Sequence, residues 1–298
     1  MRVDFYQVDV FTIALFKGNP AGVVLNADAL TAAEMQSIAR EVNNPETAFV
    51  LKPQDDSHDI RIRYFTPNIE VSGCGHATLA ACYVWARQRG FKKRLINLKL
   101  PHGILPVELL GDGKNKRVFM TQSLPKFKSV LSGSGKNHLL NALNLTPKDL
   151  IRTPVQVVDS EDSKILIPLK DKNLLNNLTP DFGRLVDVSV QFNCNGFHVF
   201  TLDNQNDITT TYARTFSPAI GVNEDPVAGS GNGHLGAYLV KYQLIKHNNR
   251  CFQFVSRQGE DINRSGFAHV TVKIEDGIPT AVKVGGDVRL VFATTIEL

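Results

Sequence analysis

Residues 64–83 read Tyr-Phe-Thr-Pro-Asn-Ile-Glu-Val-Ser-Gly-Cys-Gly-His-Ala-Thr-Leu-Ala-Ala-Cys-Tyr, and residues 215–238 begin Thr-Phe-Ser-Pro-Ala-Ile and end Gly-Ser-Gly-Asn-Gly-His-Leu-Gly-Ala-Tyr. Each stretch has the pattern of a strand, a glycine turn and an apolar helix. A duplicated segment of this kind predicts two similar halves that face one shared cleft. Because two helix N-termini would open into that cleft, it is where we expect the chemistry.

The composition is that of an ordinary globular protein, with 43% hydrophobic and 21% charged residues in 298. No run of 18 apolar residues occurs, so no membrane span is expected. Asp4 and Asp9 fall where a signal peptide would need apolar residues, which predicts a cytoplasmic protein. The cysteines form no C-x-x-C pair, so we expect free thiols and no zinc ribbon; they are Cys74, Cys82, Cys194 and Cys251.

The net charge of +4 is small for this length, and the largest basic cluster lies within residues 87–94. A solvated helix C-terminus explains that cluster, since cations complement the helix dipole there. Nucleic-acid binding would need a larger basic surface. We therefore expect neither a nucleic-acid nor a membrane partner.

Three helices are predicted, over the residues that follow the capping box Thr31-Ala-Ala-Glu34 and over about 76–89 and 233–246. The second and third are apolar nearly all round, which is typical of helices buried on every side. Alternating or β-branched segments predict a larger number of strands, at 2–9, 21–25, 47–51, 60–65, 104–109, 117–121, 154–158, 164–168, 196–202, 209–216, 268–274 and 282–292.

So many strands with one buried helix in each half argue against a doubly wound parallel sheet. The predicted fold is α+β, with two pseudo-symmetric domains, each a curved, mostly antiparallel, barrel-like sheet around a central helix. The N-terminal domain is expected to span 1–121 and to be joined by the last strand, 285–298. Residues 122–150, with Pro125, Gly133, Gly135, Pro147 and scattered lysines, are the expected crossover, and 151–284 the C-terminal domain.

The glycine turns that open the two buried helices are candidate anion sites. In residues 73–76 and 229–233, small residues let backbone N–H groups converge where the helix dipole is positive. Gly75, Gly229 and Gly231 are therefore candidates to bind a substrate carboxylate. The alternative is that these glycines only permit tight turns and close packing. Gly231, Gly233 and Gly236 also match G-x-G-x-x-G, but no hydrophobic strand precedes them, so a dinucleotide site is not expected.

Several titratable residues lie near these turns. Glu46 precedes an apolar strand, and a carboxylate partly removed from water can exchange protons near neutral pH; the alternative is a solvated loop residue. Asp225, like Glu224 before it, could act in catalysis or simply cap a helix. His76 could donate a proton or be structural. Cys74 is placed like a thiol activated by a helix dipole, and Ser230 takes its place in the second copy.

Ordered motifs run along almost the whole chain: Val8-Asp-Val-Phe-Thr, Phe16-Lys-Gly-Asn-Pro-Ala-Gly-Val-Val, Met35-Gln-Ser-Ile-Ala-Arg-Glu, Glu46-Thr-Ala-Phe-Val, Arg63-Tyr-Phe-Thr-Pro, Cys74-Gly-His-Ala-Thr-Leu-Ala-Ala, Glu224-Asp-Pro-Val-Ala-Gly-Ser-Gly-Asn-Gly, Gln258-Gly and Arg264-Ser. This series resembles the phenazine-biosynthesis PhzF-like proteins, which share the diaminopimelate epimerase fold. Within that family the chain looks closest to the uncharacterised bacterial isomerases.

The resemblance implies an isomerase that needs no cofactor and no metal, with its active site between two domains. In the family, the glutamate that matches Glu46 shuttles a proton between two carbons of a small carboxylated substrate. By the same match, His76, Asp225 and Ser230 would hold the substrate and assist proton movement, while amides of the glycine turns bind its carboxylate. Family members are commonly dimers, which points to a homodimer, although the sequence alone leaves the oligomeric state open.

Some residues depart from the family pattern. Pro45 stands beside Glu46 where relatives often carry a small polar residue, and Ala228 and Gly231 replace a common threonine and alanine. Two alternatives remain: an amino-acid racemase or epimerase that uses Cys74 as a thiol base, and a binding protein for small acids that lost catalysis on the same fold. Because Ser230 stands where a second thiol would be needed, the racemase is the weaker enzyme hypothesis.

Overall fold

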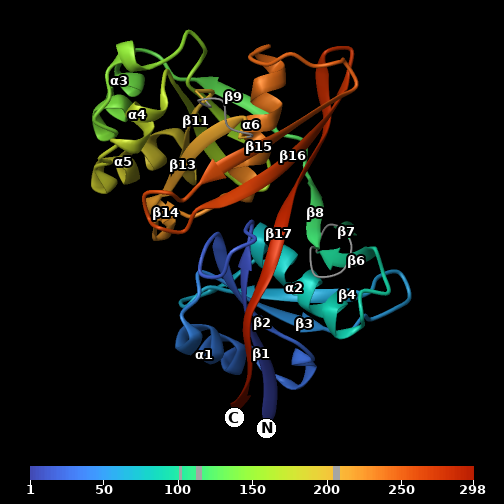
Figure 1. The fold of residues 1–298 in the computed structure, drawn as a ribbon. Coiled ribbons are helices and arrows are strands. Elements are labelled where there is room, and N and C mark those ends of the chain that lie inside the picture. The colour runs from blue at the N-terminus through green and yellow to red at the C-terminus, as the bar shows by residue number, and fades with distance from the viewer. Residues whose placement is uncertain (101–102, 112–115, 204–208) are drawn as a thin grey trace. The chain divides into compact units, whose positions relative to one another are not determined.

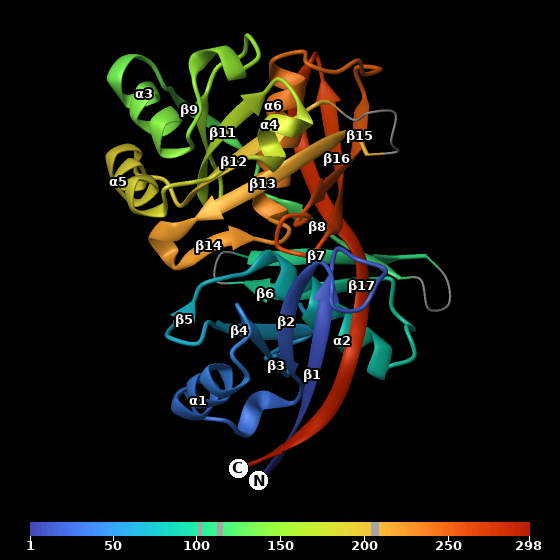
Figure 2. The same cartoon turned by 60° about the vertical axis from the view of Figure 1, so that its left-hand side comes forward.

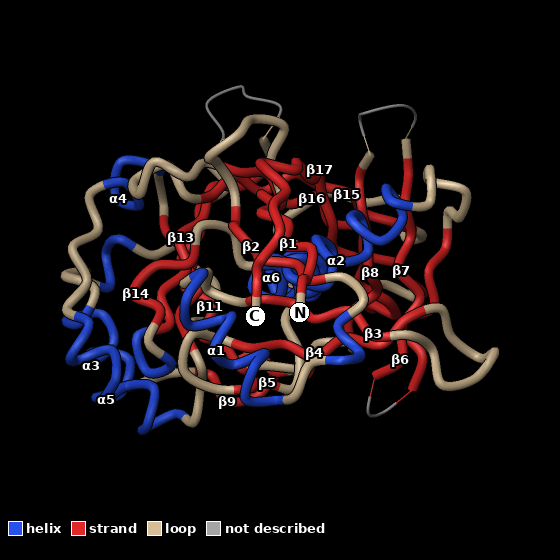
Figure 3. Tube along the Cα trace, turned by 90° about the horizontal axis from the view of Figure 1, so that it is seen from below, coloured by secondary structure: helices blue, strands red, loops and turns tan. Residues whose placement is uncertain are grey.

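The computed structural model describes residues 1–100, 103–111, 116–203 and 209–298. It divides into two compact units: unit 1 is Met1–Thr121 with Gly285–Leu298, and unit 2 is Gln122–Val284. Seventeen strands and six α-helices occur in the described residues, and Figure 3 shows the strands in red and the helices in blue. The predicted α+β class is confirmed. In the described part of the chain no helix has the length and apolar character needed to cross a membrane.

Unit 1 is a mixed sheet that packs against two helices (Figure 1). Its neighbouring strands pair antiparallel except β2 with β3 and β4 with β6, which are parallel. The elements are β1 (Arg2–Val10), β2 (Asn19–Val24), α1 (Ala32–Val42), β3 (Thr47–Leu51), β4 (Ile60–Phe65), β5 (Glu70–Val71), α2 (Gly75–Gln88), β6 (Leu95–Leu100), β7 (Gly103–Leu110), β8 (Arg117–Gln122) and the C-terminal part of β17 (Ile278–Glu297).

Unit 2 has four helices, of which α3 and α5 pack on each other (Figure 2). Only β11 with β12 and β13 with β15 run parallel among its described strand pairs. The elements are β9 (Lys126–Val130), α3 (Gly133–Ala142), β10 (Gln156–Asp159), β11 (Ser163–Leu169), α4 (Lys172–Asn176), α5 (Phe182–Phe192), β12 (Gly196–Thr201), β13 (Thr211–Ser217), β14 (Val222–Asp225), α6 (Gly229–Lys241), β15 (Cys251–Gln258), β16 (Gly266–Glu275) and the first residues of β17.

The two units repeat one topology. In unit 1 an antiparallel pair β1–β2 is followed by α1, a parallel step to β3, an antiparallel step to β4 and a parallel step to β6. In unit 2 the same steps connect β10, β11, β12, β13 and β15, with α5 in the place of α1. Helix α2 follows the short strand β5 as α6 follows β14. The sequence repeat therefore marks a duplicated fold, and the two predicted pseudo-symmetric halves are confirmed.

The central helix of each unit is buried nearly all round. Ten of the 13 residues of α6 and nine of the 14 residues of α2 are buried, so only small or apolar side chains fit on most faces. Gly236 shows how closely α6 packs: a Cβ there would lie 2.9 Å from Cγ2 of Val272 on β16. A side chain at this position would push helix and sheet apart.

The capping box at the start of α1 is present as predicted. Thr31 Oγ1 accepts the Glu34 N–H, and Glu34 Oε2 accepts the Thr31 N–H. Met35, Ile38 and Ala39 are buried against β1, β3 and β4 in the core of unit 1. This apolar face was also predicted.

Helices α3, α4 and α5 and strands β5, β6, β9, β14 and β15 were not predicted. The segment Val-Asp-Val-Ser-Val at 186–190 alternates like a strand, yet it lies in α5. Asp181 caps that helix by accepting the Arg184 N–H, and packing on α3 outweighs the β-branched residues. Helix α6 was predicted at about 233–246, but it begins at Gly229 and ends at Lys241. The glycines at 229–233 are therefore its first turns rather than a loop before it.

Candidate active site

Glu46 lies in the short connection between α1 and β3 in unit 1. Asn43, with φ of 50°, ends α1 in the left-handed conformation and turns the chain toward the sheet. The carbonyl of Glu46 accepts a hydrogen bond from the Gly22 N–H on β2 at 3.1 Å, which fixes the backbone. The side chain is 22% exposed, so its carboxylate is held at the edge of the core with access to solvent.

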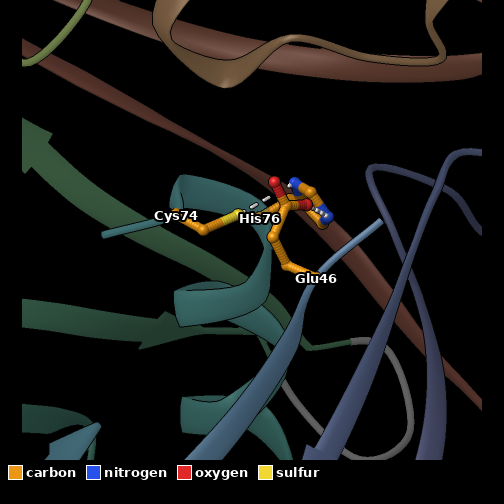
Figure 4. Close-up of side chains that lie close together, drawn as sticks. All are labelled: Glu46, Cys74 and His76. Carbon is orange, nitrogen blue, oxygen red and sulfur yellow. Dashed lines mark hydrogen bonds and ion pairs between the residues drawn. The ribbon is translucent and has the colours of Figure 1, made fainter. Parts of the chain in front are cut away.

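The imidazole of His76 sits against this carboxylate. His76 is in the first turn of α2, and its Nε2 lies 3.4 Å from Oε2 of Glu46 and 3.2 Å from the carbonyl oxygen of Pro20. A carbonyl only accepts, so Nε2 carries the proton, and in the neutral ring Nδ1 is then an acceptor. Cys74, the N-cap of α2, has its Sγ 3.4 Å from Nδ1 and donates to it. Figure 4 shows the three side chains converging.

The group can do two kinds of chemistry. A carboxylate at the N-terminus of α2 can take up and return a proton, with the His76 N–H to orient it. One ligand atom each from Glu46, Cys74 and His76 also lie within 4.8 Å of one another, and this set of oxygen, sulfur and nitrogen suits a metal ion such as Zn²⁺. The geometry alone allows both.

Gly75 in the first turn of α2 is loosely packed. A Cβ there would meet only Cε of Met120, at 3.9 Å. The first intrahelical bond of α2 is from the Thr78 N–H to the Cys74 carbonyl, so the N–H groups before it have no intrahelical acceptor. Backbone donors next to the Glu46 carboxylate are therefore available to an anion.

In unit 2, Asp225 ends β14 and its Oδ1 accepts the Val227 N–H at 3.2 Å. Its neighbour Glu224 forms a two-pronged ion pair with Arg214, at 2.7 and 3.0 Å, which ties β14 to β13. Helix α6 has Ala228 as its N-cap and no side-chain cap. Glu224 is therefore structural, and Asp225, which accepts the Val227 N–H just before α6, remains a candidate.

Ser230 lies in the first turn of α6 with Gly229 and Gly231. Its Oγ donates to Oδ2 of Asp162 at 2.9 Å, and Asp162 lies in the connection between β10 and β11. The structure thus places the candidates in two groups, with Glu46, Cys74, Gly75 and His76 in unit 1 and the remainder in unit 2.

A buried polar cluster around Asp162 was missed by the sequence analysis. Lys164 donates to Asp162 Oδ2 at 2.5 Å, and Nε2 of His234 on α6 lies 2.8 Å from Ser160 Oγ and 3.8 Å from Asp162 Oδ1. Residues 160–164 read as an ordinary polar turn between two predicted strands. Their contacts with α6 span about 70 residues of chain, so no local pattern indicates them.

The packing around position 231 requires a glycine, independently of any role in binding. A Cβ at this position would lie 2.6 Å from Nδ1 of His198, a fully buried ring held by Thr215 Oγ1 at 2.8 Å. We expect Gly231→Ala to lower the free energy of unfolding by about 1–3 kcal/mol, measured by urea denaturation. Gly73→Ala is the control, because nothing lies within 4 Å of its Cβ position. Equal stability of the two variants would contradict this account of Gly231.

Comparisons with known proteins agree with this architecture. The family model described as phenazine biosynthesis-like protein, PhzC-PhzF, matches residues 8–294. An uncharacterized isomerase of Clostridium acetobutylicum is 42% identical over 298 residues, which is 100% of this chain and 99% of that protein. The uncharacterized isomerase YddE of Escherichia coli K12 is 40% identical, over 98% of this chain and 97% of its own.

Solved structures show the same fold. A Bacillus anthracis protein of the PhzF family aligns with a TM-score of 0.88 at 28% identity, over 100% of both chains. A hydroxyproline epimerase of Agrobacterium vitis aligns with a TM-score of 0.64 at 13% identity, over 100% of this chain and 93% of its own, and shares the fold alone.

The class of protein follows from these relatives and from the duplicated fold: it is an enzyme of the isomerase type. More particularly, the chain belongs to the PhzC-PhzF family of phenazine biosynthesis-like proteins.

Proposed function

We propose that this isomerase moves a proton between two carbons of a small carboxylated substrate, with Glu46 as the general acid and base and without a cofactor. The observation that carries the proposal is the contact of the Glu46 carboxylate with His76 Nε2, at 3.4 Å, beside the N-terminus of α2. His76 holds the Glu46 side chain in place, and part of that side chain remains exposed, as is required of a group that contacts a substrate.

The reaction needs one carboxylate and no net change in composition. Glu46 removes a proton from a C–H bond, which makes the side chain a neutral acid and leaves the electron pair on the substrate. The same acid then returns the proton to another carbon of the substrate, or to the same carbon from a new direction. Substrate and product therefore have the same formula, and Glu46 ends the cycle ionised.

His76 keeps Glu46 in place during this cycle. Its Nε2–H is shared between the carboxylate and the Pro20 carbonyl, and its Nδ1 accepts from Cys74, so the ring is held at both nitrogens. A ring fixed in this way orients the base and can donate to negative charge as it develops. Cys74 acts here through His76, as a positioning residue.

The N-terminus of α2 supports the charged intermediate. An anion formed next to Glu46 would face the N–H groups that follow Cys74, which have no intrahelical acceptor. Fixed backbone dipoles stabilise such charge without having to reorient during the reaction. In unit 2, helix α6 has Ala228 as its N-cap and no side-chain cap, so the N–H groups of Gly229, Ser230 and Gly231 are candidates to bind a carboxylate.

The experiment that tests the proposal is incubation with cyclic and amino carboxylic acids in deuterated water, scored by mass for carbon-bound deuterium. We expect at least one acid to gain deuterium, at a rate that a chelator leaves unchanged. A rate lost with the chelator would instead indicate that the group of Glu46, Cys74 and His76 works with a metal. Binding of acids with no deuterium uptake would identify a binding protein.

The variant Cys74→Ser distinguishes between Glu46 and Cys74 as the catalytic base. If Glu46 is the base, this variant retains most of its turnover, because the serine hydroxyl can still donate to His76 Nδ1. A loss of turnover comparable to that of a Glu46 variant would make Cys74 a base.

A further inference from the structure

Ser230 of α6 contacts the carboxylate of Asp162, which is 28% exposed and lies in the turn between β10 and β11. Its Oγ donates to Asp162 Oδ2 at 2.9 Å, and Nζ of Lys164 donates to the same oxygen at 2.5 Å. Lys164 lies on β11 and is only 4% exposed. A buried lysine this close to a carboxylate holds it in place and favours its charged form.

The charge state of Asp162 follows from these neighbours. Burial by itself would raise the pKa of Asp162, but the charge of Lys164 and the hydrogen bonds from Lys164 and Ser230 outweigh it, so the pKa lies below its usual value. At neutral pH the carboxylate is ionised and can only accept hydrogen bonds.

The direction of the Ser230 hydrogen bond is thereby fixed. A serine hydroxyl has one proton and two lone pairs, and here the proton is given to Asp162. Toward any other group the Ser230 Oγ can only accept. A substrate carboxylate also only accepts, so the two would not bond; the carboxylate would instead be left to the backbone N–H groups of the same turn.

We propose that Asp162 is a specificity-determining residue: by taking the proton of Ser230 it makes that side chain an acceptor, which selects substrates with an amino or hydroxyl group placed to donate to Ser230 Oγ. This inference rests on the proposed function, with the Ser230 side chain taken as a group that contacts the substrate.

The same contacts argue against a proton relay through Ser230. A relay would need Asp162 to act as a base, but its pairing with Lys164 makes the carboxylate a weak one. Asp162 therefore sets the orientation of the hydroxyl and takes no part in the proton transfer itself.

A thiol reporter tests the arrangement without any ligand. In Ser230→Cys, the pH at which alkylation of residue 230 is half-maximal reports the thiol pKa, followed by peptide mass spectrometry. Adding Asp162→Asn should lower that midpoint by about 1 pH unit or more, because a neighbouring negative charge is removed. Cys74 and Cys251, both partly exposed, are internal references whose midpoints should stay the same. An unchanged midpoint at residue 230 would overturn the inference.

A second variant guards against misfolding. Asp162→Asn leaves Lys164 buried without its partner, which can destabilise the chain. If that variant does not fold, Asp162→Asn with Lys164→Met removes both charges, and the midpoint should still fall because Asp162 is the group in contact with residue 230.

A matched pair of ligands tests the selectivity. cis-2-Hydroxycyclohexanecarboxylate can donate from its hydroxyl, whereas its methyl ether can only accept. By ligand-observed NMR we expect the native protein to prefer the hydroxy acid by about tenfold, the size of one hydrogen bond. Asp162→Asn should remove or reverse the preference. The asparagine amide can donate to Ser230 Oγ, and the Ser230 hydroxyl can then donate its own proton to the ligand. A preference unchanged by Asp162→Asn would overturn the inference, and if neither acid binds, the thiol reporter decides it.

Failure of this inference and failure of the proposed function are distinguishable. Both tests measure binding or thiol reactivity, so they can be carried out in Glu46→Gln, which has no base. A ligand preference that Asp162→Asn removes, together with no deuterium uptake by any acid in the native protein, would leave Asp162 as a determinant of binding and reject the isomerisation.

Discussion

Glu46→Gln is expected to reduce the rate of carbon-bound deuterium uptake by about a thousandfold or more. General acid–base groups contribute about 10²–10⁴ to a rate, and glutamine has the shape of glutamate but cannot take up the proton. The backbone bond between the Gly22 N–H and the Glu46 carbonyl does not depend on the side chain, so the link between β2 and β3 remains. We therefore expect the variant to melt at nearly the native temperature while the reaction stops.

Glu41→Gln is the matched control. Glu41 lies near the end of α1, five residues before Glu46, and its side chain is exposed. The same chemical change there should leave the rate within a factor of two. If Glu46→Gln retained a tenth or more of the native rate on the true substrate, the proposed mechanism would be wrong.

Unit 2 is expected to lose stability steeply in mild acid. Burial lowers the pKa of His198 to about 3 and that of His234 to about 4, with the charge of Lys164 adding to the effect for both. Between pH 6.5 and 4 both rings stay neutral in the folded protein but bind protons in the unfolded chain, so stability is full above pH 6.5 and falls below it. For each ring, the free energy of unfolding falls by about 1.4 kcal/mol for each pH unit below 6.5.

Urea denaturation at pH 7, 6, 5 and 4.5 measures this dependence. Gln in place of His234 keeps a hydrogen-bonding group for Ser160 but does not titrate, so His234→Gln should reduce the slope by about 1.4 kcal/mol per pH unit. His247→Gln, in the segment after α6, controls for the loss of a partly exposed histidine. An identical slope in His234→Gln and the native protein would show that His234 does not supply the acid sensitivity.

Much of the fold could be predicted because its signal is local and repeated. Strands β3 and β4 begin and end where the alternating pattern does, and the apolar residues of α2 leave it no face suited to solvent. The elements that were not predicted depend on contacts between residues far apart in the sequence. The strand-like alternation in α5 is overridden by its contact with α3, which lies about 50 residues away in the chain.

The same distinction applies to the candidate site. Cys74 and His76 are two residues apart, and the motif that holds them could be read directly from the sequence. The partner of Ser230 could not, because Asp162 lies 68 residues before it and in a turn that resembles any polar hairpin. Whether a serine hydroxyl donates or accepts depends on such distant neighbours. The structure is therefore needed to see that Ser230 already donates its proton to Asp162.

The long strand β17 has a consequence for biosynthesis. Its residues from Gly285 onward belong to unit 1 and pair with β1, from Val10 with Val288 to Arg2 with Glu297. One edge of β1 pairs with the nearby β2, but its other edge stays unpaired until residues 288–297 have been synthesised, whereas the residues of unit 2 are contiguous. Folding of unit 1 therefore cannot be completed before β17 is synthesised, and we expect a truncation before Val288 to leave this edge of β1 open.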